Sequence, residues 1–161
     1  MKKYLVCSDI HERTRYLEEA LKKHSDIDGV ILAGDYETDS YDIDAIVKTN
    51  APKGASLHMV KGNCDAYLTS TSTLPNVLTF NISPSHKVFL THGHLYHGRA
   101  DMISYAAQEN YCDIVIFGHI HKQVDDVLSG IRILNPGALK NNSYMILTVD
   151  DNENIDVKFV G

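Results

Sequence analysis

The chain has 161 residues with a formal net charge of −6, and 43% of its residues are hydrophobic. That length fits one domain with a single core. The acidic balance argues against a general nucleic-acid binder, which needs a basic face, and no apolar run approaches the roughly 18 residues of a membrane span. Three cysteines without CxxC spacing indicate neither a disulfide framework nor a thiolate zinc site. We therefore expect one cytoplasmic domain over residues 1–161.

Short apolar runs alternate with helical patterns through the first two thirds of the chain. They predict strands at 4–7, 30–33, 57–60, 77–81, 87–91 and 114–117. Helices are predicted after Thr14, which is the expected N-cap of the first, and over the ranges 42–49 and 99–110.

The last part of the chain has a different pattern. Strand-like runs are found at 124–128, 131–134, 144–149 and 155–160. Turn pairs such as Ser129-Gly130 and Asp150-Asp151 separate them and favour antiparallel hairpins. The sequence thus predicts βαβ units followed by a β meander, in an α/β domain.

A polar loop follows each of five predicted strands. The loops contain Ser8-Asp9-Ile10-His11, Gly34-Asp35, Gly62-Asn63-Cys64-Asp65, Thr91-His92-Gly93-His94 and Gly118-His119-Ile120-His121. In open α/β sheets, ligands bind beyond the carboxyl ends of the strands. We therefore expect these side chains, which are distant in the sequence, to converge at one site.

The residue types in these loops are those that bind metal ions. Imidazole and carboxylate ligands without thiolate suit Mn, Fe, Zn, Co or Ni, and the Asp-x-His and His-x-His spacings place alternate side chains on one side of an extended loop. The candidate ligands are Asp9, His11, Asp35, Asn63, His92, His119 and His121. So many ligands suit two divalent ions, about 3.5–4 Å apart, that share a bridging carboxylate. Two such ions against two carboxylates leave a charge of about +2, which favours an anionic substrate.

Each motif alone has a simpler explanation. Asp-x-His, Gly-Asp and Gly-Asn are common in turns and at helix starts, and a single His-x-His is more often part of a solvated loop. All five motifs in this order, each at a strand end, are hard to explain by coincidence. Residues outside the motifs keep the simpler explanation: core thiols for Cys7 and Cys112, and surface or edge positions for His24, His58 and His86.

Together, the five motifs resemble the calcineurin-like metallophosphoesterase superfamily. The short length and the Gly-Asn-Cys-Asp sequence are similar to its small YfcE-like phosphodiesterase branch, and the resemblance extends from Asp9 to the Asn135-Pro136-Gly137 turn. It implies a four-layer α/β sandwich, in which two mixed β-sheets are flanked by helices and two metal ions lie at the strand ends.

The resemblance also implies a role for each candidate ligand. The first metal ion would be held by Asp9, His11 and His121. The second would be held by Asn63, His92 and His119, with Asp35 as the bridge. A metal-bridging hydroxide would attack phosphorus in line while the ions stabilise the equatorial oxygens. Manganese is the expected metal, with zinc, iron, nickel and cobalt as alternatives.

One position departs from the wider superfamily, in which many members have a histidine after Gly-Asn that assists the leaving group or contacts phosphate. Here that position is Cys64, as in the YfcE-like branch, and a thiol with a pKa near about 8.5 is a poor substitute. His94 is then the candidate for phosphate contact or proton donation, and Asp65 the candidate that orients a neighbouring side chain. With Asn63, these two form the predicted catalytic set.

The predicted function is metal-dependent hydrolysis of phosphodiesters, and of some phosphomonoesters, in small phosphorylated substrates. A phosphatase or nucleotidase for one metabolite is a rival, because the ligands fix the reaction centre while loops fix the substrate.

The alternative from another class is a non-catalytic scaffold, since the fold is shared with a retromer coat subunit. The filled ligand positions favour the enzyme. We expect no membrane association and no stable nucleic-acid complex, and we consider a homodimer through an exposed sheet edge.

Overall fold

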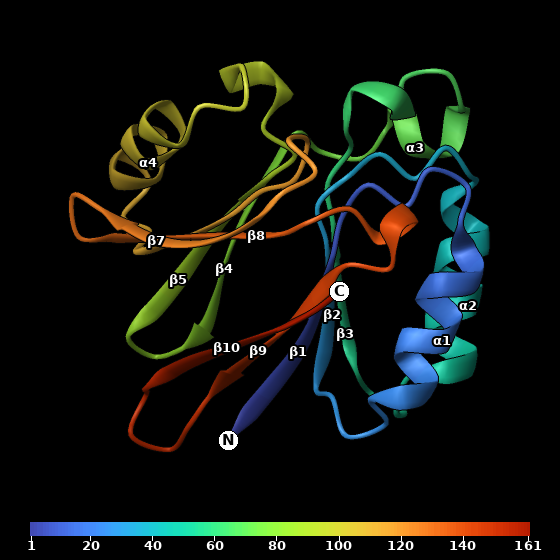
Figure 1. The fold of residues 1–161 in the computed structure, drawn as a ribbon, viewed down its shortest axis with the longest axis horizontal. Coiled ribbons are helices and arrows are strands. Elements are labelled where there is room, and N and C mark those ends of the chain that lie inside the picture. The colour runs from blue at the N-terminus through green and yellow to red at the C-terminus, as the bar shows by residue number, and fades with distance from the viewer.

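Two mixed five-stranded sheets pack face to face, with α1 and α2 on one outer side and α4 on the other (Figure 1). The computed structural model describes residues 1–161. The helices are α1 (Thr14–Lys23), α2 (Ser40–Asn50), α3 (Thr69–Ser72) and α4 (Ala100–Glu109). The strands are β1 (Lys2–Cys7), β2 (Gly29–Leu32), β3 (Ser56–Met59), β4 (Val77–Ser83), β5 (His86–Thr91), β6 (Ile114–Ile116), β7 (Gln123–Leu128), β8 (Ile131–Pro136), β9 (Tyr144–Val149) and β10 (Ile155–Val160). The predicted four-layer sandwich is confirmed.

The strand order brings the polar loops together. The first sheet has the order β10-β9-β1-β2-β3 and the second the order β4-β5-β6-β8-β7. β1, β2 and β3 are parallel to one another, as are β5, β6 and β8. Because parallel strands end at the same edge of a sheet, the loops after β1, β2, β3, β5 and β6 gather at one end of the sandwich.

The predicted β meander is wrong. β7 and β8 form an antiparallel hairpin in the second sheet, whereas β9 and β10 form one in the first sheet. Both faces of β9 are apolar: Met145 and Leu147 lie between the sheets, and Tyr144 and Ile146 face the cluster under α1. A strand of this kind is stable where both faces are covered, and β9 finds that place beside β1 in the first sheet.

The start of the first helix also differs from the prediction. α1 begins at Thr14, so the N-cap position belongs to Arg13, and no side chain caps the helix. The preceding turn is fixed from elsewhere: the amides of His11 and Glu12 donate to carbonyl oxygens in the loop after β2, at 3.1 and 2.9 Å. The start of α1 is therefore tied to the loop that carries Asp35 rather than set by a capping side chain.

Three apolar clusters fill the three interfaces between the four layers. Leu17 of α1 packs against the first sheet, Val6 lies between the sheets, and Ile103 of α4 packs against the second sheet. Each fully buried side chain of this size stabilises the fold by about 1.5–3 kcal/mol. Cys7 and Cys112 are buried members of these clusters, as predicted. No helix has the length and apolar character needed to cross a membrane.

Three of the histidines outside the motifs, His24, His58 and His86, are more enclosed than expected. The ring of His58 stacks on Phe80 with centroids 3.8 Å apart, and His24 lies 3.0 Å from the hydroxyl of Tyr144. His86 Nδ1 lies 2.6 Å from Asp113, and its Nε2 lies 2.8 Å from a carbonyl oxygen of the β9–β10 turn. They hold layers or turns together and stand apart from the polar loops.

Candidate metal centre

The loops that carry the predicted ligands share an unusual backbone conformation. Left-handed φ angles between 44° and 69° occur at Asp9, His11, Asp35, His119 and His121. A residue with a side chain in this region is strained by about 1–3 kcal/mol, and such residues cluster at active sites and ligand-binding sites. Five of the seven candidate ligands therefore carry this strain, which also occurs at Glu12 and Glu37 in the same loops.

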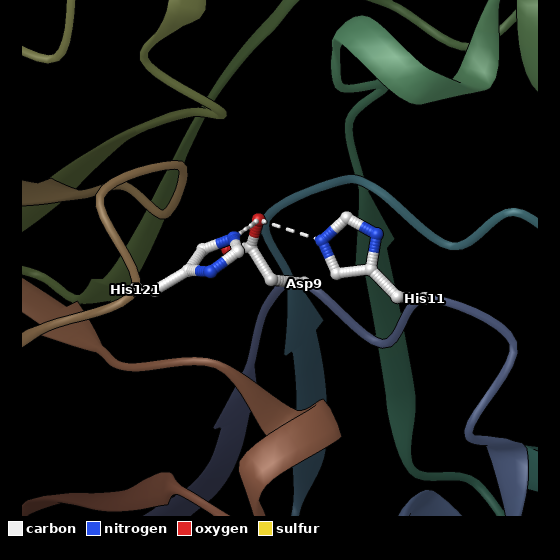
Figure 2. Close-up of side chains that lie close together, drawn as sticks. All are labelled: Asp9, His11 and His121. Atoms are coloured by element: carbon white, nitrogen blue, oxygen red, sulfur yellow. Dashed lines mark hydrogen bonds and ion pairs between the residues drawn. The ribbon is translucent and has the colours of Figure 1, made fainter.

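Asp9 lies at the centre of the site and is fully buried. Its Oδ2 accepts hydrogen bonds from the Ser8 hydroxyl at 2.7 Å and the His119 amide at 3.0 Å. Its Oδ1 lies 3.1 Å from His121 Nε2 and 3.5 Å from His11 Nε2, between the two rings in Figure 2. One oxygen is thus anchored to the protein, and the other faces imidazole nitrogens.

Asp35 is held in the same way, with one oxygen hydrogen-bonded to the backbone and the other facing imidazole nitrogens. Its Oδ1 accepts a hydrogen bond from the Cys64 amide at 2.9 Å, while Oδ2 lies 3.2 Å from His92 Nε2 and 3.9 Å from His11 Nε2. Burial acts to raise the pKa of Asp35, but the hydrogen bond and charge of His92 and the Cys64 amide outweigh it and lower the pKa to about 2. The carboxylate stays ionised and lies between two histidines from different loops.

His92 is fully buried and has a fixed orientation. Its Nδ1 lies 2.6 Å from the carbonyl oxygen of Ala33. Because that oxygen can only accept, Nδ1 carries a proton, and Nε2 is the nitrogen that presents a lone pair when the ring is neutral. Burial acts to lower the pKa of His92, and the nearby carboxylates of Asp35 and Asp9 raise it overall.

Two buried histidine nitrogens without hydrogen-bond partners show whether a cation fits this site. His11 Nε2 and His92 Nε2 are buried without a hydrogen-bond partner, although both face ionised carboxylates. Buried polar atoms in native proteins almost always have partners, and a divalent cation would satisfy both nitrogens and the free carboxylate oxygens together. Three groups of side chains have ligand atoms mutually within 4.8 Å: Asp9–His11–His121, Asp9–Asp35–His92 and His11–Asp35–Cys64. The residues present therefore fit metal ions.

The other predicted residues lie around this centre at different distances. The His119 ring centroid is 5.2 Å from that of His92, and the His94 ring centroid is 5.5 Å from it. His94 Nδ1 is buried without a partner, and burial followed by the charge of His92 lowers the pKa of His94. Asn63 is exposed, and its amide donates to the Cys64 sulfur at 3.6 Å. Asn63 is thus at the rim, and no contact joins it to the carboxylates.

Asp65 is fully buried and holds backbone rather than side chains. Its Oδ2 accepts from the amides of Gly62 at 2.7 Å and Asp35 at 2.8 Å, and its Oδ1 accepts from the amide of Tyr36 at 2.9 Å. These bonds fasten the loop after β2 to the loop after β3. The structure therefore places Asp65 where it positions Asp35, away from the open side of the site.

Sequence reasoning missed two residues that contact the ligands. Ser8 donates to Asp9, and Glu37 Oε1 lies 3.1 Å from His11 Nδ1. A signal was present for both: Ser8 is adjacent to Asp9, and Glu37 follows Asp35 at the same two-residue spacing that pairs Asp9 with His11. The role of each residue depends on the side chain that it contacts in the folded protein, which the sequence alone does not show.

The environment of Cys64 makes its thiol a weak acid. Its sulfur is within 4.8 Å of ligand atoms of His11 and Asp35. Burial first, and then the negative charges of Asp35 and Glu37, raise the pKa of Cys64 to about 12. These neighbours do not favour a proton-donating role for this thiol.

Comparisons with known proteins identify the family to which the chain belongs. Residues 2–152 match the calcineurin-like phosphoesterase superfamily domain. The chain belongs to this superfamily. It is 32% identical over 164 aligned positions to the probable metallophosphoesterase YsnB of Bacillus subtilis, covering 96% of this chain and 88% of the relative. A predicted phosphoesterase of Streptococcus pneumoniae has a crystal structure that matches 99% of this chain and 88% of its own, with a TM-score of 0.78 and 27% identity. The family and these relatives identify a metal-dependent phosphoesterase.

The same fold occurs in a protein-sorting family. Vps29 of Entamoeba histolytica, in a crystal structure complexed with Zn²⁺, matches 98% of this chain and 98% of its own, with a TM-score of 0.72 and 22% identity. That identity establishes a common fold only. The superfamily domain is therefore not by itself a statement about substrate, and the assignment of substrate depends on the site.

Proposed function

We propose that this protein hydrolyses phosphodiester bonds of small phosphorylated substrates, with lower activity on some phosphomonoesters, using two divalent metal ions. The observation that carries the proposal is the pair of anchored carboxylates, Asp9 and Asp35, facing the unpartnered nitrogens of His11 and His92. Four such groups from three loops have no structural need to meet, since replacing them with apolar residues would stabilise a core as well or better.

The geometry supports the division of ligands that the resemblance to the superfamily implies. Asp9, His11 and His121 form one compact group. His92, with His119 beside it, lies on the other side of Asp35. Asp35 Oδ2 and Asp9 Oδ1 are each within 4 Å of nitrogens from both groups. Of these two carboxylates, Asp35 is the proposed bridge.

Asn63 completes the second group in this proposal. Its side chain is exposed next to Cys64, so rotation toward His92 and His119 breaks only one weak contact to sulfur. Manganese is the proposed metal.

The charges around the site favour diesters over monoesters. Divalent ions here would supply Lewis acidity and lower the pKa of water, which is the chemistry that in-line phosphoester hydrolysis requires. Among the basic side chains near the motifs, Arg99 pairs with Asp101 at 2.7 Å and Lys61 donates to the carbonyl of Ser72 at 2.9 Å, whereas Arg13 and Lys122 are exposed and make no ion pair. Because no basic side chain is hydrogen-bonded to the candidate ligands, the single charge of a diester is matched better than the double charge of a monoester.

His94 is the proposed contact for the phosphate or the leaving group. It adjoins His92, and its buried Nδ1 has no protein partner. A neutral imidazole has one nitrogen that donates, which can be offered to a phosphate oxygen or to a departing alkoxide.

The remaining proposals concern location and partners. Three free thiols fit a reducing, cytoplasmic setting, and the net charge of −6 fits the absence of a stable nucleic-acid complex. Arg132 and Gln123 donate to carbonyl oxygens at the two ends of the β10 edge. A homodimer formed by strand pairing would therefore use a different edge strand.

The test is hydrolysis of bis-p-nitrophenyl phosphate by protein stripped with a chelator, with and without added Mn²⁺. We expect turnover that depends on the metal, disappears in Asp35→Asn, and exceeds turnover of p-nitrophenyl phosphate. The absence of turnover with every divalent metal, in folded protein, would instead favour the non-catalytic scaffold.

A further inference from the structure

Glu37 is a charged residue at the site to which neither the motifs nor the superfamily resemblance gave a role. It lies in the loop after β2, two residues after Asp35, and its carboxylate Oε1 is 3.1 Å from His11 Nδ1. The Glu37 side chain is 37% exposed, so it sits at the boundary between the buried centre and solvent. Nothing else in the structure approaches His11 Nδ1 with a hydrogen-bonding group.

We propose that Glu37 is a positioning residue that fixes the tautomer and ring orientation of His11 for metal binding. Its effect on metal affinity rests on the proposed function, whereas its effect on the His11 tautomer is a property of the protein alone. A carboxylate only accepts hydrogen bonds, so Nδ1 must carry the proton. The lone pair then belongs to Nε2, the nitrogen that lies 3.5 Å from Asp9 Oδ1 and 3.9 Å from Asp35 Oδ2.

Backbone hydrogen bonds hold the loop after β2 where the Glu37 side chain reaches His11. Glu37 has a left-handed φ of 52°, and its amide is 3.4 Å from Asp65 Oδ1. The loops that carry Glu37 and His11 are joined directly, because the His11 amide donates to the carbonyl of Asp35 at 3.1 Å. Strain of this kind persists only where the surroundings enforce it, so the position of Glu37 is set by the same bonds that set the ligands.

Glu12 provides a control for Glu37, because it is a nearby glutamate that does not contact the His11 ring. Glu12 has a left-handed φ of 65° and lies directly after His11, yet its side chain is exposed and makes no hydrogen bond or ion pair. Removing the Glu12 carboxylate therefore changes the local charge by the same amount and leaves His11 untouched. Glu12→Ala is the matched control for Glu37→Ala.

The first readout uses metal-free protein. Nitrogen-15 NMR of the imidazoles distinguishes which ring nitrogen bears the proton. We expect the wild type and Glu12→Ala to hold His11 with Nδ1 protonated, and Glu37→Ala to lose this preference. Glu37→Gln keeps an amide oxygen that can accept from Nδ1, so it should retain the tautomer. Glu37→Met fills a similar space without an oxygen acceptor, so it should lose the preference if the hydrogen bond and not the volume is what matters.

The second readout is the affinity for Mn²⁺ measured by calorimetric titration. Hydrogen-bond partners of metal-binding histidines typically contribute about 10–100-fold in affinity. We expect a loss in that range for Glu37→Ala, a smaller loss for Glu37→Gln, and none for Glu12→Ala. An unchanged tautomer in Glu37→Ala would overturn the inference.

The two readouts separate this inference from the proposed function. If the wild type fails to bind Mn²⁺ but Glu37→Ala still changes the His11 tautomer, the positioning role stands and the proposed function fails. If the wild type binds and Glu37→Ala binds equally well, the positioning role fails and the proposed function stands. Circular dichroism and thermal unfolding check that each variant is folded before either reading is made.

Discussion

Asp65 offers the sharpest test of how this fold holds its candidate ligands. Its carboxylate accepts three short backbone hydrogen bonds, from the amides of Gly62, Asp35 and Tyr36, at 2.7, 2.8 and 2.9 Å. All are buried, so Asp65→Ala leaves three amides without partners in the protein. A buried amide that loses its partner costs about 1–3 kcal/mol.

The expected loss of stability follows from these bonds. Water can enter the space left by the removed carboxylate, so the lower end of the range applies, and the three amides together give about 3 kcal/mol. In a domain of this size each kcal/mol lowers the melting temperature by about 2–4 °C, which predicts a decrease of about 6–12 °C. Asp65→Asn keeps one acceptor oxygen but turns an NH₂ group toward a backbone amide, so we expect an intermediate effect.

The assay is urea unfolding of metal-free protein followed by circular dichroism, with Glu109→Gln as the control. Glu109 is exposed and its side chain makes no hydrogen bond, so its free energy of unfolding should match that of the wild type. If Asp65→Ala unfolds at the same urea midpoint as Glu109→Gln, the idea that Asp65 anchors the loop of Asp35 is refuted. If Asp65→Ala is as stable as the wild type and also binds Mn²⁺ with unchanged affinity, both measurements contradict an anchoring role for Asp65.

Three further predictions use other parts of the structure. Gly118→Ala would place a Cβ atom 2.7 Å from Asp9 Oδ2, so we expect calorimetry to show a large loss of Mn²⁺ affinity. The control is Gly130→Ala, which has no atom within 4 Å of the new Cβ and should bind Mn²⁺ as the wild type does. Burial acts to lower the pKa of His86, but its hydrogen bond to Asp113 raises this pKa overall. The bond therefore stabilises the fold fully below about pH 6.5, which is the pKa of histidine in the unfolded chain. This stabilisation is lost as the pH rises through the pKa of His86 in the folded protein. Urea unfolding across this range should show that loss in the wild type, and a pH-independent difference between wild type and His86→Gln would contradict it. Mn²⁺ at about 100 times its dissociation constant should stabilise the protein by about 2.7 kcal/mol, which a chelator should reverse in a thermal melt.

The features that the sequence predicted well depend on local patterns. The apolar run ending at Cys7 and the polar residues Asp9 and His11 that follow it are visible without any knowledge of the partner strands. Period-2 and period-3.6 patterns depend only on which side of an element is buried, and the convergence of strand ends follows from parallel packing. This is why the loops of the site were predictable from residue order, whereas the four-layer sandwich was implied by the resemblance to the superfamily.

The features that the sequence left open depend on which elements meet. The pairing of β9 with β1 instead of β8 is decided by the burial of both its faces, which is a property of the assembled layers. The anchoring of Asp35 by Asp65 joins residues 30 positions apart through backbone amides, which every residue but proline has and which therefore leave no pattern in the sequence.

The amino-acid sequence by itself determined which chemical groups this protein brings together: carboxylates and imidazoles at the ends of parallel strands, in an order that resembles the calcineurin-like metallophosphoesterase superfamily. The tertiary structure alone decided how those groups are held, with one oxygen of Asp9 and one of Asp35 fastened to neighbouring loops and the other left free. The physical reason is that side-chain identity fixes what a group can bind, whereas the direction of its free lone pairs is set by hydrogen bonds from distant parts of the chain.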